Sequence, residues 1–160
     1  MTGKGNEKLH SLVSQDLHVR FLTACLNGDL ENVIDALELH ADVNRTGLGN
    51  LTGLMHAAKE GHVEVVEILV ARDDCDINQS DEDGETAFSL VCRRGIYSVA
   101  KILLNCDVLD INTVDVNMMT PLHKAISNNH VDIVQLLLEH SEFNVKSPPL
   151  YITLLNVSFR

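Results

Sequence analysis

The sequence predicts an all-α fold, a solenoid in which short helix-turn-helix units stack side by side and carry β-turn fingers. Two observations predict this class. Marker residues recur every 34 residues along the chain, namely Thr52, Thr86, Thr120 and Asn44, Asn78, Asn112. A constant period of this length is typical of stacked supersecondary units. The chain is also 45% hydrophobic but only 4% aromatic, which favours a core of packed aliphatic helices.

The first helix of each unit is expected to begin at the threonine marker. A threonine hydroxyl caps a helix N-terminus, and Pro121 suits the first helical position after Thr120. In the first unit Val19 takes the place of the threonine, so we expect that helix to begin at Val19. Small residues such as Ala57 and Ala58 follow on the inner face. Residues that adopt left-handed geometry then end each helix, and these are Gly28, Gly61, Gly95 and Asn129.

The second helix of each unit carries apolar residues at helical spacing, as in Val65, Val66 and Leu69. An extended stretch ending in Asp-Val-Asn or Asp-Ile-Asn follows, and then a turn such as residues 80–85, rich in turn-forming residues. The first unit places polar Asn32 and Asp35 where later units have apolar residues. This substitution predicts an N-terminal cap whose outer face meets water.

The periodicity divides the chain into three regions. Residues 1–18 precede the repeats and include a stretch able to form a covering helix. The repeat domain spans 19–144, with units of about 19–47, 48–81, 82–115 and 116–144. A tail of residues 145–160 cannot continue the repeat, because Pro148 and Pro149 stop a helix. Two interpretations of the tail stay open: it covers the fourth unit, or the natural protein continues differently here.

Charge and cysteine content exclude several classes of protein. Twelve Lys and Arg against 23 Asp and Glu give a net charge of −11, which disfavours binding to nucleic acid or anionic membranes. No apolar stretch resembles a secretory signal or reaches the roughly 18 residues of a membrane span. The four cysteines form no CxxC pair, so we expect reduced thiols and a cytoplasmic or nuclear protein.

Catalytic and metal-binding motifs are absent from the sequence. It contains no GxSxG, HExxH or GxxxxGK[ST] pattern. His62 and His130 occupy the same position two units apart, which indicates a structural role rather than metal binding. We therefore expect no catalytic residue, no metal site and no cofactor.

Three segments together resemble the ankyrin repeat: residues 120–125 (TPLHKA), 56–70 (HAAKEGHVEVVEILV) and 39–44 (LHADVN). The resemblance covers roughly residues 19–144. It implies a Thr–His hydrogen bond at the start of the first helix. We expect this bond only in unit four, because only His123 keeps the histidine. Asn50 and Met118 replace the fingertip glycine that unit three keeps as Gly84, so we expect less regular turns in fingers two and four.

The resemblance also implies a function. Ankyrin arrays bind proteins on a concave face formed by the fingers and the exposed side of the first helices. We therefore expect a monomeric, non-catalytic module acting as scaffold, adaptor or stoichiometric inhibitor. Two alternatives stay open, a fragment of a larger signalling protein and an enzyme that uses the array as a scaffold. Carried over to this sequence, the face comprises Leu48, Leu51, Lys59, Glu60, Glu82, Asp83, Glu85, Arg93, Arg94, Val116, Asn117, Met119, Ser127 and Asn128.

Within this face we expect Arg94 and Met119 to act as binding anchors. Two alternatives apply to such residues. Apolar side chains at the fingers, Leu48 and Val116 among them, either face a partner or fold back onto neighbouring fingers. Arg93 and Arg94 either pair with carboxylates of a partner or balance the acids of residues 81–85.

The resemblance further implies a modification. Some ankyrin repeats are hydroxylated on the finger-base asparagine by an iron- and 2-oxoglutarate-dependent oxygenase, which favours a leucine eight residues before the asparagine and an acid two before. Leu104 and Asp110 provide that context for Asn112. We therefore expect Asn112 to be modified ahead of Asn44 and Asn78.

Overall fold

The computed structural model describes residues 16–140 of the 160-residue chain. Residues 16–27 are helical, and the elements that follow are α2 (Leu30–Glu38), the 3₁₀ turn η1 (Leu48–Asn50), α3 (Gly53–Glu60), α4 (Val63–Val70), α5 (Ala87–Arg94), α6 (Tyr97–Leu104), α7 (Pro121–Ser127) and α8 (Val131–Glu139). Within this part of the chain the strand-like pairing is limited to a bridge between Ser80 and Thr86. The predicted all-α solenoid is confirmed.

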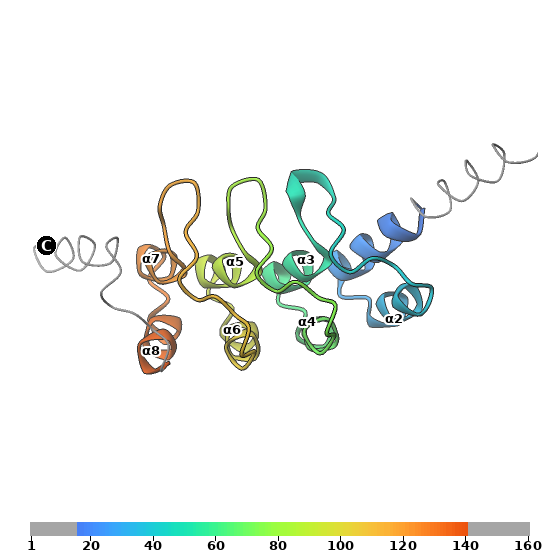
Figure 1. The fold of residues 1–160 in the computed structure, drawn as a ribbon. Helices are drawn as coiled ribbons and strands as arrows, with labels where there is room; N and C mark the ends of the chain where they lie inside the picture. Colours follow the sequence, from blue (N-terminus) through green and yellow to red (C-terminus); the bar gives the residue numbers. More distant parts are fainter. Residues whose placement is uncertain (1–15, 141–160) are drawn as a thin grey trace, which may run out of the picture.

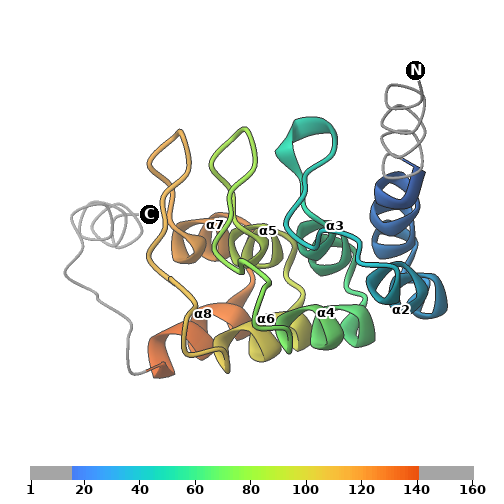
Figure 2. The ribbon, with the colours of Figure 1, turned by 45° about the vertical axis from the view of Figure 1, so that its right-hand side comes forward.

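The helices form two layers (Figure 1). One row contains α3, α5 and α7, with α5 packed between the other two, and the second row contains α2, α4, α6 and α8. Three fingers project from the first row and stand next to one another in both views (Figures 1 and 2). They are named after their units: finger two is residues 47–51, finger three is residues 81–85 and finger four is residues 115–119, and in each the first N–H donates to the last carbonyl. The array therefore has a face built from fingers and first-row helices, and an opposite face built from second-row helices.

Threonine caps explain where the first-row helices begin. The hydroxyl oxygens of Thr52, Thr86 and Thr120 each accept the backbone N–H three residues later, at 3.2 to 3.3 Å. Thr120 Oγ1 and His123 Nδ1 also share the predicted hydrogen bond, at 2.6 Å. Helices of seven or eight residues are marginal alone, so packing between units must stabilise them.

Small buried residues allow that packing. Ala57 and Ala58 are fully buried in α3, as predicted, and Val91 and Cys92 are fully buried at the matching positions of α5. Asn32 and Asp35 of α2 are exposed, which agrees with a first unit that presents a polar face.

Burial raises the pKa of the Cys25 thiol to about 12 and that of the Cys75 thiol to about 11, so both stay protonated at neutral pH.

The predicted start of the first helix is wrong. Residues 16–18 are already helical, so Val19 lies inside the helix. Valine has no side-chain oxygen to cap a helix, and His18 is buried with its Nε2 donating to the carbonyl of Thr46 at 3.1 Å. The predicted covering helix within residues 1–18 lies mostly outside the described residues. The tail 145–160 and the last residues of unit four also lie outside them.

Candidate partner-binding face

An aspartate at the base of fingers three and four organises each turn. Asp81 Oδ1 accepts the N–H groups of Asp83 and Glu85, at 2.9 and 2.8 Å. Asp115 Oδ1 accepts those of residues 117 and 119, both at 2.8 Å. Finger two has Gly47 at the equivalent position and closes instead with the 3₁₀ turn η1. Fingers three and four are therefore the same turn, whereas finger two is a variant.

The fingertips adopt left-handed backbone geometry, with φ of 58° at Asn50, 77° at Gly84 and 59° at Met118. Finger four repeats the hydrogen bonds of finger three although it has no tip glycine, so the expected irregularity at Met118 is wrong. The bonds to Asp115 hold Met118 in a conformation that glycine adopts more easily. The expected irregularity of finger two is confirmed, because η1 lies there.

Hydrogen bonds also join the fingers to one another. The N–H of Glu82 donates to the carbonyl of Gly49 at 3.2 Å, and the N–H of Val116 donates to that of Asp83 at 2.9 Å. The side chain of Asn50 adds a third bond, to the carbonyl of Ser80 at 2.9 Å. The three fingers are thus held as one row rather than as separate loops.

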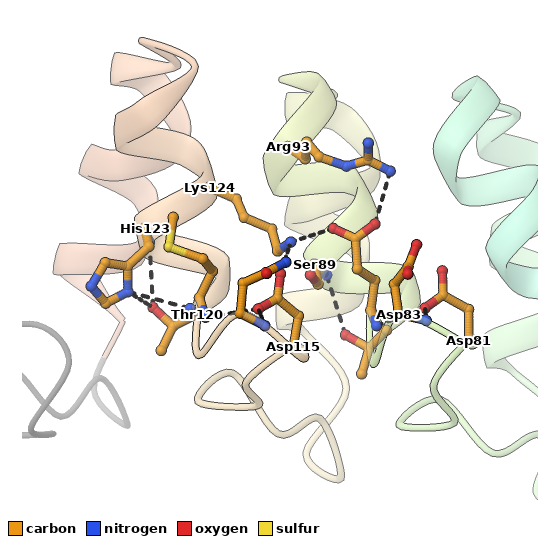
Figure 3. A network of polar contacts seen from close by, with 12 residues as sticks. Asp81, Asp83, Ser89, Arg93, Asp115, Thr120, His123 and Lys124 are labelled. Atoms are coloured by element: carbon orange, nitrogen blue, oxygen red, sulfur yellow. Dashed lines mark hydrogen bonds and ion pairs between the residues drawn. The ribbon is translucent and has the colours of Figure 1, made fainter.

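A buried ionic cluster lies beneath fingers three and four, where Figure 3 shows Lys124 of α7 extending between the two. Lys124 Nζ donates to Glu85 Oε1 and, at 2.6 Å, to Asp115 Oδ2. The side chains of these three residues are at most 8% exposed. Arg93 Nη2 lies 2.8 Å from Glu85 Oε2 and remains half-exposed. Two buried carboxylates and two cations therefore neutralise one another here.

The cluster shifts the pKa of two members. Burial alone would raise the pKa of Asp115, but hydrogen bonds from Lys124 and from two backbone N–H groups outweigh it and lower that pKa. Burial alone would lower the pKa of Lys124, but its bonds to Asp115 and Glu85 outweigh it and raise that pKa. Both groups stay charged at neutral pH, which suits a fixed ion pair rather than a proton-transferring site.

Glu85 is a correction to the predicted face, because it is buried in this cluster and unavailable to a partner. Leu48 and Val116 are 95% and 67% exposed, so they do not fold back onto neighbouring fingers. Met119 and Leu51 are only partly exposed. The structure thus leaves the fingertip residues accessible and removes one acid from the predicted face.

The arginines of the face already have acidic partners within the chain. Arg93 pairs with Glu85, and Arg94 Nη2 lies 3.7 Å from Glu60 Oε1. The remaining predicted residues are accessible at least in part: Lys59, Glu60, Glu82, Asp83, Asn117, Ser127 and Asn128. Sequence reasoning missed Met118 and Val114, which are 61% and 41% exposed. The sequence signal that could have pointed to Met118 is that it stands where finger three has Gly84.

The finger-base asparagines connect successive units. Asn44 donates to the carbonyl of Asp74 at 2.6 Å and accepts the N–H of Asp76 at 2.7 Å. Asn78 makes the equivalent bonds to Val108 and Asp110, at 2.7 and 2.8 Å. The equivalent partners of Asn112 would be residues 142 and 144, outside the described residues. Hydroxylation of Asn112 stays a prediction.

Two histidines confirm their predicted structural role. His62 Nε2 donates to the carbonyl of Leu26 at 2.9 Å, and His130 Nε2 donates to that of Arg93 at 3.1 Å. Each ring therefore caps the C-terminal end of the first helix of the preceding unit, which is the helix of residues 16–27 for His62 and α5 for His130. Among residues 16–140 no group of three or more potential ligands is arranged to hold a metal ion. No helix in the same range has both the length and the apolar character needed to cross a membrane.

Comparison with known families agrees with this geometry. A family model described as ankyrin repeats (3 copies) matches residues 21–115 and 54–148. The chain belongs to the ankyrin-repeat family. It is 34% identical over 118 residues to the human SMC5-SMC6 complex localization factor protein 1, an alignment covering 73% of this chain and 11% of that protein.

Two further relatives come from other organisms. The Drosophila melanogaster ankyrin repeat and KH domain-containing protein mask is 33% identical over 91 residues, 55% of this chain and 2% of that protein. The Medicago truncatula protein VAPYRIN-LIKE is 31% identical over 114 residues, 70% of this chain and 24% of that protein. The chain thus spans a quarter or less of the length of these relatives. Ankyrin arrays are protein–protein interaction modules, and the family is generally non-catalytic.

Proposed function

We propose that this ankyrin array is a monomeric, non-catalytic adaptor or scaffold that binds a protein partner on the face formed by the fingers and the exposed ends of α3, α5 and α7. The observation that carries the proposal is the exposure of large apolar side chains at fingers that are hydrogen-bonded into one row. Such a row needs little ordering when a partner binds, which favours affinity. We further propose a cytoplasmic or nuclear location, in keeping with four free cysteines.

Charge argues for a protein partner rather than a nucleic acid. The net charge of −11 would repel phosphate groups, and the two arginines of the face are already paired with carboxylates. An interface that mixes exposed apolar residues with both signs of charge is typical of specific protein contacts.

The test is quantitative affinity capture from cytosolic extract with three proteins: the full chain, a face variant and a control variant on the opposite side of the array. The face variant carries Arg94→Glu with Ser127→Arg, two exposed positions on α5 and α7. The control carries Glu67→Arg at an exposed position of α4, on the opposite side of the array. We expect a partner retained by the control and lost by the face variant, with unchanged helical content in both. A partner lost only by the control would place binding on the second-row helices.

A further inference from the structure

The fingertips have a charge pattern that nothing within the described chain neutralises. Glu82 and Asp83, at the tip of finger three, are exposed and form no ion pair with any residue of 16–140. In contrast, two neighbouring acids have partners within the chain, the buried Glu85 with Lys124 and the exposed Glu60 with Arg94. Two unpaired carboxylates at the middle of the row leave a negative potential there.

Apolar side chains flank those acids on both sides. Leu48 on finger two is 95% exposed, and Val116 and Met118 on finger four are 67% and 61% exposed. Most of the surface of these three side chains is left in contact with water, so the exposed part contributes nothing to the stability of the fold. Read along the row, the tips are apolar, acidic and apolar.

Met118 adds an independent observation. Its φ of 59° is left-handed, while the equivalent residue of finger three is a glycine. A left-handed conformation costs a residue with a side chain roughly 1–2 kcal/mol relative to the usual one. A side chain that stays exposed while its backbone is strained is more consistent with a contact outside the array than with its own folding.

We propose that the fingertip row, defined as Leu48, Glu82, Asp83, Val116 and Met118, binds an extended protein segment in which a basic side chain lies between two apolar ones. The proposal rests on the proposed function and specifies the partner's chemistry. Leu48 and the finger-four residues would hold the apolar side chains, and the acids would select Lys or Arg between them. Apolar contacts supply most of the affinity in such interfaces, whereas charge supplies selectivity.

The spacing of the units fixes the pattern of that segment. Packed helices lie about 8–10 Å apart, and a chain in the polyproline II conformation advances about 3.1 Å per residue with three residues per turn, so that every third side chain points the same way. One finger therefore corresponds to about three residues of the bound segment. The row fits an apolar residue, two spacers, a basic residue, two spacers and a second apolar residue.

The test uses fluorescence polarisation with labelled synthetic heptapeptides and the full chain. The reference peptide has leucine at both ends, arginine at the centre and serine elsewhere. Companion peptides place glutamine or glutamate at the centre, or serine at both ends. We expect the reference peptide to bind at least about tenfold more tightly than each companion, because each lacks one of the two contacts.

Variants of the protein then assign the binding to the row. Glu82→Lys with Asp83→Lys should reverse the preference, so that the glutamate peptide binds best. Leu48→Ser with Met118→Gly should weaken the reference peptide about tenfold. Glu64→Lys with Glu67→Lys on α4 makes the same change of net charge at exposed positions away from the fingers, and should leave binding unchanged.

Three results would overturn the proposal: reference binding no tighter than that of the peptide with serine at both ends, equal binding of the arginine and glutamate peptides, or equal loss in the α4 control. The affinity capture described above separates the two proposals. If the captured partner is lost by Arg94→Glu with Ser127→Arg yet kept by both fingertip variants, the proposed function stands and the fingertip segment is wrong.

Discussion

The junction between units two and three and the junction between units three and four place different residues at equivalent positions. Leu90 of α5 lies where Lys124 lies in α7, 34 residues later, and Leu51 lies where Glu85 lies. Leu90 is 2% exposed and Lys124 is 7% exposed, so both fill the interior. The repeat geometry therefore requires that this space be filled, and either aliphatic or ionic side chains can fill it.

The aliphatic junction and the ionic junction are expected to respond differently to substitution. Where aliphatic side chains fill the junction, a substitution lowers the stability of the protein roughly in proportion to the buried atoms that it removes. A buried ion pair that loses one member leaves an uncompensated charge, which costs far more, although replacing the whole set by apolar residues is often neutral. The junction of units three and four should therefore be the more sensitive of the two to single substitutions.

The aspartates at the base of fingers three and four, Asp81 and Asp115, differ between the two junctions in the direction of their pKa shifts. Burial raises the pKa of Asp81, which has no lysine beside it, although its bonds to two backbone N–H groups act against the rise. The pKa of Asp115 is lowered instead, because bonds from Lys124 and two backbone N–H groups outweigh burial. Equivalent residues in consecutive units thus shift in opposite directions.

The largest expected effect is that of Lys124→Leu, which copies the residue of the neighbouring junction but leaves buried Asp115 without its cation and buried Glu85 with only the half-exposed Arg93. We expect a loss of about 3–5 kcal/mol in the free energy of unfolding, measured by urea denaturation followed by circular dichroism. The double variant Lys124→Leu with Glu85→Leu makes the junction resemble its neighbour and should recover most of that loss. A double variant no more stable than Lys124→Leu would show that the two solutions are not interchangeable.

The second effect concerns the glycines that end α3 and α5. Gly61 has φ of 82° and Gly95 has φ of 77°, so alanine is strained at both. A Cβ at Gly61 would lie 3.4 Å from Ile96 Cγ2, whereas a Cβ at Gly95 would overlap the ring of His130. We expect Gly95→Ala to lose about 3 kcal/mol and Gly61→Ala about 1–2 kcal/mol. Equal thermal shifts for the two variants would mean that the His130 ring moves aside freely.

The third effect is a pH dependence of opposite sign at Asp81 and Asp115. The lowered pKa of Asp115 contributes stability that is present above its unfolded pKa, about 3.9, and is lost as pH falls through its folded pKa. The raised pKa of Asp81 means that its ionisation opposes folding as pH rises. Asp115→Asn should therefore lose about 2 kcal/mol at pH 7, and Asp81→Asn should lose nothing or gain slightly. Unfolding curves from pH 3 to pH 7 test this, and the Asp115→Asn difference should shrink near pH 3.

The smallest effect is that of Met118→Gly. Glycine relieves the left-handed strain but adds freedom to the unfolded chain, so we expect a gain of 0 to about 1 kcal/mol. Gly84→Ala provides the reverse change in finger three and should lose about 1 kcal/mol or more. A clear loss in Met118→Gly would show that the methionine side chain supports the array, which would also weaken the fingertip proposal.

Most of the fold could be predicted from the sequence because its signals are local. The threonine caps, the glycine ends and the bond between Thr120 and His123 each involve residues a few positions apart, and the 34-residue period repeats them. The predicted helix start at Val19 was wrong because the 34-residue period places the helix but does not show whether the residue at the threonine position can cap it. Finger four has the same geometry as finger three because hydrogen bonds to Asp115 outweigh the preference of Met118 for right-handed backbone geometry.

The candidate site was less predictable because it depends on distant contacts. Lys124 and Glu85 are 39 residues apart, and at both positions another unit carries leucine, so no repeated pattern marks them. A charged residue beside a turn is ordinarily solvated, which is why Glu85 was placed on the surface. For Leu48 and Val116 the sequence left two alternatives open, exposure or folding back onto neighbouring fingers, and the structure shows both side chains exposed.

The asparagine bonds have a mechanical consequence. Asn44 and Asn78 each hold the loop of the following unit by two short bonds, so these links follow one another along the axis of the array. Links arranged in series do not share a load, so a force that pulls the ends apart acts in full on each of them. The array should therefore extend in steps of about one unit, at low force and reversibly, and behave as a soft spring rather than as a brittle rod.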